Sequence, residues 1–238
     1  MTVDILTLFP DIIEPFFTNS IMAKSVKNGV IDYNLVDIRD FAFDVHKTCD
    51  DAPYGGGAGM VLKPEPLGRA LDSIQAKNKR VVYPSPSGKP FTQSYAQELS
   101  QEEQLVFICG RYEGIDQRII DLYVDDEICI GDYVISSGEV ATLVIIDAVY
   151  RLLEGVISRE SLLEESFTGG LLEYPHYTRP ETYCSIAVPE ILLSGHHARI
   201  EQWRLRKRLQ KTVANRPDLL EKGVISNEVK KLLEELKS

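Results

Sequence analysis

The sequence predicts an α/β fold with a mainly parallel sheet, followed by a small helical domain. Short β-branched apolar runs alternate with helical stretches through the first part of the chain. This alternation is typical of parallel sheets with helices on both faces. From residue 173 onward the pattern becomes helical and shows no strand alternation. We therefore expect an α/β domain over 1–156, an interdomain linker over 157–172 and a helical domain over 173–238.

The elements of the α/β domain can be assigned in chain order. Strands are expected in short apolar or alternating runs, and helices where apolar residues recur every three or four positions. Pro84 and Pro86 are expected to break the strand that begins at Arg80. The helix over 138–153 is nearly all apolar, which predicts burial on most sides. The expected strands are 2–9, 31–38, 80–83, 105–109 and 127–130, and the other expected helices begin at Pro10 or cover 67–74, 92–100 and 116–123.

Composition limits the class of protein. A chain of 238 residues with 44% hydrophobic content is long and apolar enough to bury a proper core. The net charge of −10 argues against a general nucleic-acid coat, so any contact with nucleic acid must be local. The cysteines form no CxxC pair, and Met1 leads directly into a strand instead of a signal segment. We expect a cytoplasmic protein with reduced thiols and no membrane span.

Two glycine-punctuated loops, Gly110–Gly114 and Gly131–Gly138, directly follow two of the predicted strands. Ligands of open α/β sheets bind outside the carboxyl ends of strands, so the two loops predict one pocket. Glu113 and Asp132 lie inside these loops, where a carboxylate could hold a ligand hydroxyl or amine, or cap a helix instead. Either loop taken alone is equally compatible with a tight strand-to-helix turn.

A third glycine-rich stretch, DDAPYGGGAGM over 50–60, closes a long polar segment. It lacks the Lys-Ser/Thr pair of a Walker loop, so a nucleoside triphosphatase is not expected. Its glycines would let the chain run close to a ligand or a neighbouring subunit. Asp50 could accept hydrogen bonds from a base edge, although acidic residues in loops are most often only solvated.

The helical domain carries a basic face that stands against the acidic balance of the chain. The alternative to a binding face is a solvated face, which amphipathic helices often have. Ser194 is predicted to cap this helix, and His196 lies at the same terminus, where a phosphate or a base could bind. The basic residues fall at i, i+3, i+4 and i+7, and they are Arg204, Lys207, Arg208 and Lys211.

Five ordered motifs together resemble the bacterial tRNA (guanine-N1)-methyltransferases of the knotted SPOUT class. They are PYGGGAGM, GRYEGID, IGDYVISSGE, EYPHYTRP and LLSGHH, and the similarity extends over nearly the whole chain. The resemblance implies that the α/β domain ends in a deep trefoil knot and that the chain forms a homodimer. It also implies that S-adenosylmethionine binds in the knot and that tRNA is gripped by both subunits.

By position, the resemblance places the cofactor pocket on three loops. It also implies a magnesium ion, although the sequence shows no closed set of ligands and the metal site is unknown. The implied cofactor-binding residues are Tyr83, Pro84, Ser85, Pro86 and Ser87 from the first loop, Gly110, Tyr112 and Glu113 from the second, and Ile130, Gly131, Asp132, Tyr133, Val134, Ile135 and Gly138 from the third.

The reaction that the resemblance implies is methyl transfer to N1 of the tRNA guanosine immediately 3′ of the anticodon. Guanine N1 carries a proton at neutral pH, so a base must remove it while negative charge develops on O6. The family's base and arginine correspond to Glu165 and Arg151 here. The family has aspartate at the first position, and the additional methylene of Glu165 displaces the carboxylate. Ser137 stands where the family usually has glycine, which would cost binding if that position needs a positive φ.

The resemblance matches Asp50, Ser194 and His196 to base contacts and gives the basic face to tRNA. Two other interpretations stay open. A knotted methyltransferase acting on another RNA site or on the ribose would not need a carboxylate at Glu165. A non-catalytic RNA-binding dimer that kept the fold would tolerate both Glu165 and Ser137.

Overall fold

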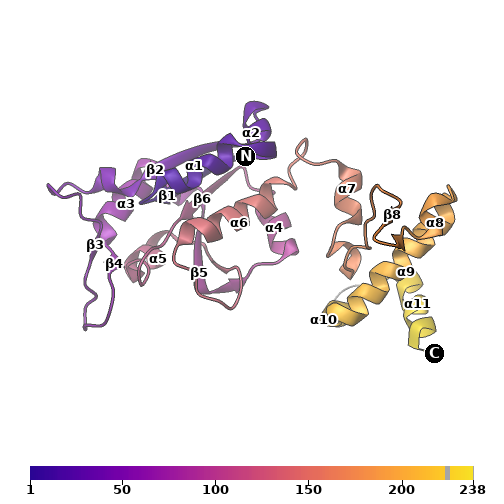
Figure 1. The fold of residues 1–238 in the computed structure, drawn as a ribbon. Helices are drawn as coiled ribbons and strands as arrows, with labels where there is room; N and C mark the ends of the chain where they lie inside the picture. The colour runs from indigo at the N-terminus through magenta and orange to yellow at the C-terminus, as the bar shows by residue number, and fades with distance from the viewer. Residues whose placement is uncertain (223–225, 238) are drawn as a thin grey trace. The chain divides into compact units, whose positions relative to one another are not determined.

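The computed structural model describes residues 1–222 and 226–237 of the chain. The chain forms two compact units, Met1–Ile157 and Ser158–Ser238. In Figure 1 the chain runs from the indigo N-terminus in the first unit to the yellow helices of the second. The segment expected to be a linker, 157–172, therefore falls almost wholly in the second unit, where it is partly helical.

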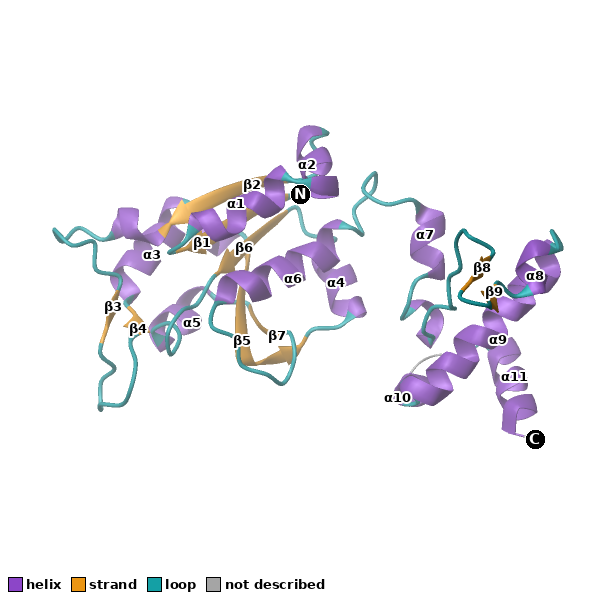
Figure 2. Ribbon diagram, in the orientation of Figure 1, coloured by secondary structure: helices purple, strands orange, loops and turns teal. Residues whose placement is uncertain are grey.

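The first unit is built on a five-stranded sheet whose pairings are all parallel, in the order β2-β1-β6-β5-β7. The predicted parallel sheet is thereby confirmed (Figure 2). Because β6, β5 and β7 are neighbours, the loops that follow them leave the sheet side by side. The strands are β1 (Thr2–Thr7), β2 (Asp32–Asp37), β5 (Arg80–Pro90), β6 (Gln104–Ile108) and β7 (Asp126–Cys129).

Helices pack on both faces of this sheet. Along β6, Leu105 and Phe107 belong to one buried core, whereas Val106 and Ile108 belong to the other. A strand buried on both faces has no polar side, which explains its continuous apolar sequence. One core includes residues of α1 (Pro10–Thr18), α2 (Ser20–Lys27), α4 (Gln93–Leu99) and α6 (Gly138–Tyr150), and the other includes residues of α3 (Pro64–Ser73) and α5 (Gln117–Tyr123).

The strand β5 runs further than its prolines predict. It continues to Pro90 because it pairs with Ile128 of β7 twice, through Pro84 and again through Lys89. The prolines thus occupy an irregular stretch instead of a regular ladder. A Cβ atom on Gly88 would lie 2.4 Å from the backbone nitrogen of Ile128, so the backbones of β5 and β7 are in direct contact there.

The helix α6 is less buried than its sequence predicts. Ile145 and Val149 are buried in the core, but Val140 and Val144 are 50% and 45% exposed. The two exposed valines are four residues apart, so they share one face of the helix. α6 therefore presents an apolar stripe on the surface of the first unit.

The polar segment before residue 60 is more ordered than a simple loop. It begins with the 3-10 turn η1 (Ile38–Phe41) and contains β3 (Asp50–Asp51), which pairs antiparallel with β4 (Val61–Leu62). The glycine-rich stretch is therefore the tip of a hairpin. A second 3-10 turn, η2 (Ala76–Asn78), precedes β5.

The second unit is mainly helical, with a small core around Leu171, Leu209 and Val229. A two-stranded hairpin of β8 (Thr182–Tyr183) and β9 (Ile186–Ala187) was not expected, since strands this short show no alternation. The helical elements are α7 (Arg159–Glu164), η3 (Thr168–Gly170), α8 (Glu190–Leu193), α9 (His197–Asn215), α10 (Asp218–Lys222) and α11 (Asn227–Lys237).

The expected cap of the basic helix is wrong. α9 begins at His197 with His196 as its N-cap residue, and Ser194 instead ends α8, where its hydroxyl donates a hydrogen bond of 2.7 Å to the carbonyl oxygen of Ile191. Gly195 separates the two helices with a φ of +70°, which favours glycine. None of the helices within residues 1–222 and 226–237 combines the length and apolar character needed to cross a membrane.

Candidate active site

The loops that follow β6 and β7, together with the irregular stretch of β5 around Pro84, line a cavity of about 260 Å³. The two glycine loops predicted to form one pocket do line a single cavity. All the cofactor-binding residues that the resemblance implied line it except two, Ser87 and Asp132. Ser87 instead hydrogen-bonds with Ser85 and Glu127, and Asp132 is exposed. Further lining residues are Arg111, Gly114, Ile128, Cys129, Ser136, Ser137 and Ala141.

Two glycines let the walls of this pocket come together. The Gly138 amide donates a hydrogen bond of 2.9 Å to the Gly110 carbonyl. A Cβ atom on Gly138 would lie 2.5 Å from the Gly110 nitrogen, and one on Gly110 would lie 2.9 Å from the ring of Tyr83. Burial, with the nearby Glu127 carboxylate, raises the pKa of Tyr83, so its hydroxyl stays neutral. The glycines are therefore required by close approach.

Ser137 does not carry the backbone strain that a replaced glycine could have imposed. Its φ is −158° and its ψ is 141°, an extended conformation that serine adopts readily. Its side chain is buried beside the pocket. The position therefore does not need a positive φ, and serine costs no backbone strain here.

The hairpin of β3 and β4 packs against the second pocket loop. The Glu113 amide donates a hydrogen bond of 3.0 Å to the Met60 carbonyl, and the Leu62 amide donates one of 3.0 Å to the Gly114 carbonyl. Gly59 has a φ of +84°, and a Cβ atom there would lie 2.4 Å from Oε1 of Glu113. The glycine-rich tip therefore packs closely against Glu113, whose carboxylate lines the pocket. Asp50 lies half-buried at the base of the same hairpin.

Arg111, which lines the pocket, forms an ion pair with the buried Glu139. The Nε atom of Arg111 lies 3.0 Å from Oε2 of Glu139, which is fully buried in the first turn of α6. Neither atom makes a well-aligned hydrogen bond among the described residues, so the attraction is ionic and not directional. The Thr7 hydroxyl donates 2.7 Å to the other oxygen of Glu139, and the helix N-terminus also favours its charge. The pair joins β1, the loop after β6 and α6.

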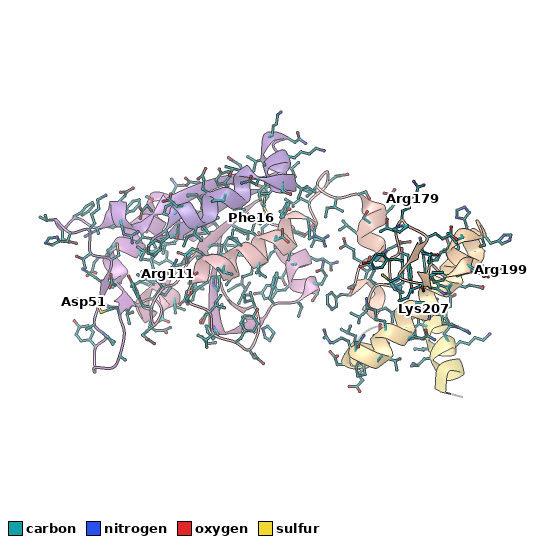
Figure 3. The ribbon with its side chains drawn as sticks, viewed as in Figure 1. Phe16, Asp51, Arg111, Arg179, Arg199 and Lys207 are labelled. Atoms are coloured by element: carbon teal, nitrogen blue, oxygen red, sulfur yellow. The ribbon has the colours of Figure 1, made fainter. Side chains whose placement is uncertain are left out.

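Aromatic contacts extend this network. The Arg111 guanidinium lies over the ring of Phe9, 4.4 Å from its centroid, and the Arg39 guanidinium lies 4.8 Å from the same centroid. Figure 3 labels Arg111 in the first unit. Sequence reasoning missed Arg111 because its partner Glu139 is 28 positions away, and only the adjacent Gly110 gave a signal.

The two residues matched to catalysis belong to different units. Arg151 is the C-cap residue of α6 in the first unit, and Glu165 is the C-cap residue of α7 in the second. Both side chains are half-buried. Arg151 lies near the end of the helix expected over 138–153, whereas the helix that ends at Glu165 was not predicted.

The segment around Glu165 is held against α9, and we call residues 164–172 the strap. Arg208 donates hydrogen bonds of 2.8 Å and 3.2 Å to the carbonyls of Thr168 and Leu172. The Leu172 amide in turn donates 2.9 Å to the Thr212 hydroxyl. Because guanidinium bonds to carbonyls are charge-assisted, Arg208 is a strong anchor for the strap.

A second anchor lies at Glu164. The Tyr174 hydroxyl donates a hydrogen bond of 2.5 Å to its carboxylate, and Arg204 pairs with it at 3.3 Å. Burial first, and then the bond to Glu164, raises the pKa of Tyr174 to about 12, although the Arg204 charge opposes the rise. Tyr174 therefore stays a neutral donor.

The residues of the predicted basic face therefore differ in their surroundings. Arg204 and Arg208 make contacts inside the second unit, whereas Lys211 is exposed and the Lys207 amino group lies 5.9 Å from the Trp203 ring centroid. Sequence spacing could not distinguish these roles, because all four residues share one side of the helix. Ser194 and His196 are exposed between α8 and α9. Within the described ranges, no three His, Cys, Asp or Glu side chains come together to hold a metal ion.

A family model and several known proteins match this chain over most or all of its length. The family model described as tRNA (Guanine-1)-methyltransferase TrmD matches residues 1–222. A Treponema denticola protein named tRNA (guanine-N(1)-)-methyltransferase is 64% identical over 242 residues, covering 100% of both chains. Proteins with the same name from Treponema pallidum and Borreliella burgdorferi are 60% and 62% identical, over 99% and 92% of this chain and 96% and 92% of theirs. The chain belongs to the tRNA (guanine-1)-methyltransferase TrmD family.

Proposed function

We propose that this protein transfers a methyl group from S-adenosylmethionine to N1 of the tRNA guanosine immediately 3′ of the anticodon. The observation that carries the proposal is the single pocket that two motif loops, after β6 and β7, line together with the irregular stretch of β5. Membership of the family supports the reaction class, and the names of the relatives support tRNA as the substrate.

The pocket fits S-adenosylmethionine by the character of its walls. The contact between Gly110 and Gly138 leaves a cradle that a Cβ atom would fill, and Ile130 and Val134 add apolar surface for a purine ring. The Glu113 carboxylate can accept hydrogen bonds from hydroxyl or amine groups. When bound, the cofactor supplies an electrophilic methyl group on its sulfonium. Our further proposal that this part of the chain is knotted rests on the resemblance and on membership of the family.

Glu165 and Arg151 carry the acid and base chemistry in this proposal. The Glu165 carboxylate accepts the N1 proton of guanine, and the Arg151 guanidinium donates to O6 as negative charge develops there. Neither residue lines the cofactor pocket. Substitution of Glu165 should therefore change the rate of methyl transfer and leave the affinity for the cofactor unchanged.

We propose that two copies of the chain form a homodimer that brings these residues together. Val140 and Val144 offer an exposed apolar stripe on α6, which a second copy would cover. Sedimentation equilibrium tests the dimer, and Val144→Glu should shift it toward monomers because a charge would be buried at the interface.

Magnesium is a further proposed requirement, which rests on the resemblance. Since Mg²⁺ keeps several waters and is often held by few carboxylates, it does not need a closed cluster of side chains. Removal of Mg²⁺ with EDTA should lower the rate of methyl transfer, and restoring Mg²⁺ should recover it. Calcium at the same concentration is the matched control for ionic strength.

The deciding experiment compares two tRNA transcripts that differ only in the nucleoside 3′ of the anticodon, guanosine or adenosine. We expect label from S-adenosylmethionine on the guanosine transcript alone, at N1. Equal labelling of both would support a methyltransferase acting on another site or on ribose. Absence of label with cofactor still bound would support a non-catalytic RNA-binding dimer.

Two substitutions then test the base. Glu165→Gln keeps the size of the side chain but cannot accept the proton, so we expect kcat to fall by about 100-fold or more. Glu165→Asp restores the carboxylate on a shorter side chain and should recover part of the rate. A rate unchanged in Glu165→Gln would contradict the assigned role.

A further inference from the structure

A second cavity, of about 340 Å³, lies entirely within the second unit. One wall is the EYPHYTRP motif, which contributes Tyr174, His176 and Tyr177, and the other is α9. The helix residues at 197, 200, 201 and 204 lie at i, i+3, i+4 and i+7, so one helix face lines the cavity. The cofactor pocket and this cavity share no residue.

Aromatic rings dominate the walls of this cavity. The rings of Tyr177 and Trp203 have centroids 6.4 Å apart and planes inclined at 54°, so they are not stacked on each other. Tyr174 and His176 form a second tilted pair at 4.8 Å and 47°. Tyr177 is 47% exposed and Trp203 is half-buried. Ring faces that are not covered by each other are the surface on which a planar ligand stacks.

Polar groups on the same walls can pair with the edge of such a ligand. The Nε atom of Arg204 is buried and has no hydrogen-bond partner in the part of the chain that the structure describes. That atom is closed to a ligand, but the Arg204 side chain as a whole is 36% exposed, and its remaining donors can pair with a ligand acceptor. Glu201 is exposed on the same face of α9 and can accept from amine or imino groups.

The charge around the cavity favours a polyanion. The whole chain has a net charge of −10, yet α9 concentrates positive charge, with Glu201 as its single acidic residue. Figure 3 labels Arg199 and Lys207 on this helix. A cationic ligand would be repelled here, whereas an RNA backbone would be attracted. The basic residues of α9 are Arg199, Arg204, Arg206, Lys207, Arg208 and Lys211.

We propose that this cavity binds one unpaired base of the RNA substrate, stacked on Tyr177 or Trp203 and hydrogen-bonded by Arg204 and Glu201. Aromatic faces beside a positive helix are how proteins hold splayed bases of RNA loops. The base is a different one from the methyl acceptor, because Glu165, the proposed base of the reaction, does not line this cavity. The inference rests on the proposed function only in taking tRNA as the RNA.

The chain contains a single tryptophan, Trp203, which makes the cavity directly observable. Titration of the full-length protein with the guanosine transcript should quench its fluorescence, with the same Kd that filter binding gives. Tyr177→Ala should raise that Kd by about 5- to 150-fold, the equivalent of 1–3 kcal/mol for one stacked base. The Kd for S-adenosylmethionine and the kcat at saturating tRNA should stay at wild-type values.

Two further variants keep the test decisive. Tyr183→Ala removes another exposed tyrosine of the same unit, on β8 outside the cavity, and should leave the Kd for tRNA unchanged. Trp203→Phe keeps an aromatic ring and should retain affinity within a few-fold. Thermal unfolding of each variant separates a loss of binding from a loss of folding.

The outcomes separate this inference from the proposed function. If the wild type methylates the transcript but Tyr177→Ala binds tRNA as well as the wild type does, the cavity is not a base site. A change of oligomeric state in Tyr177→Ala without loss of tRNA affinity would assign the cavity to a protein contact and overturn the proposal. Quenching by tRNA together with failure to methylate would support the base site and refute the proposed reaction.

Discussion

Replacing Gly138 with alanine tests whether the cofactor pocket depends on the contact between α6 and the loop after β6. The added Cβ atom would lie 2.5 Å from the Gly110 nitrogen and 3.0 Å from two backbone atoms of Cys109. These neighbours belong to the backbone, so no side-chain rotation relieves the clash. The loop and the helix start must separate instead.

The separation can be estimated from the contact distances. Ordinary contact of a Cβ atom begins at 3.4 Å, so a neighbour at 2.5 Å must move by about 0.9 Å. The hydrogen bond between the Gly138 amide and the Gly110 carbonyl, now 2.9 Å, would then be stretched beyond a useful length. Overpacking of this kind costs about 1–3 kcal/mol. Because both residues line the pocket, we expect binding of S-adenosylmethionine to weaken by about 5- to 150-fold.

Isothermal titration with S-adenosylmethionine measures this effect. The matched control is Gly68→Ala in α3, where the new Cβ atom would meet the Ile119 side chain at 3.5 Å and the Tyr123 hydroxyl at 4.0 Å, both ordinary contacts. A glycine-to-alanine change inside a helix should be neutral or stabilise the fold by about 0.5–1 kcal/mol. Wild-type affinity in Gly138→Ala would refute the argument that backbone contact between these two segments forms the pocket.

Three other predictions concern the strap, the sheet edge and the thiols. Arg208→Ala removes the anchor of the strap, so kcat for methyl transfer should fall more than tRNA affinity; a loss of affinity alone would show that the residue contacts RNA. Burial opposes ionisation of Asp126, but its bonds with Arg80 and Tyr95 prevail and lower its pKa. The ionised Asp126 carboxylate therefore contributes its full stabilisation above about pH 4, and this contribution is lost as the pH falls through the lowered pKa. The midpoint of urea unfolding should consequently fall less on acidification in Asp126→Asn than in the wild type. Iodoacetamide should label the exposed Cys184 and spare Cys109, since burial raises the pKa of that thiol; mass spectrometry of the labelled peptides checks this.

Much of the first unit could be predicted because its signals are local. The run at 105–108 is β-branched, apolar and short, and each of its residues is buried on one face or the other. The course of β5 could not be predicted, because its continuation past Pro84 depends on a second pairing with Ile128, a contact between distant segments. The predicted N-cap of α9 was wrong for another reason. Gly195 lets the chain turn between Ser194 and the start of the helix, so His196 takes the N-cap position.

The candidate site divides in the same way. Glycines after strands predicted the pocket loops, because a glycine at a strand end gives a local signal of close approach. The Arg111–Glu139 pair gave no such signal, since two charges far apart in sequence become partners only through the packing of α6 on the sheet. The inward contacts of Arg208 were likewise invisible, because helical spacing predicts which residues share a face but not what covers that face.

The contacts of the strap restrict how Glu165 can act. Before it, Glu164 is held by Tyr174 and Arg204, and after it the Ser166 hydroxyl accepts a hydrogen bond of 3.1 Å from the Glu173 amide. With the side chains of both neighbours held, the extra methylene of a glutamate is best accommodated by torsions of the Glu165 side chain itself. The position of the proposed base is then a property of the second unit, while the first unit forms the cofactor pocket.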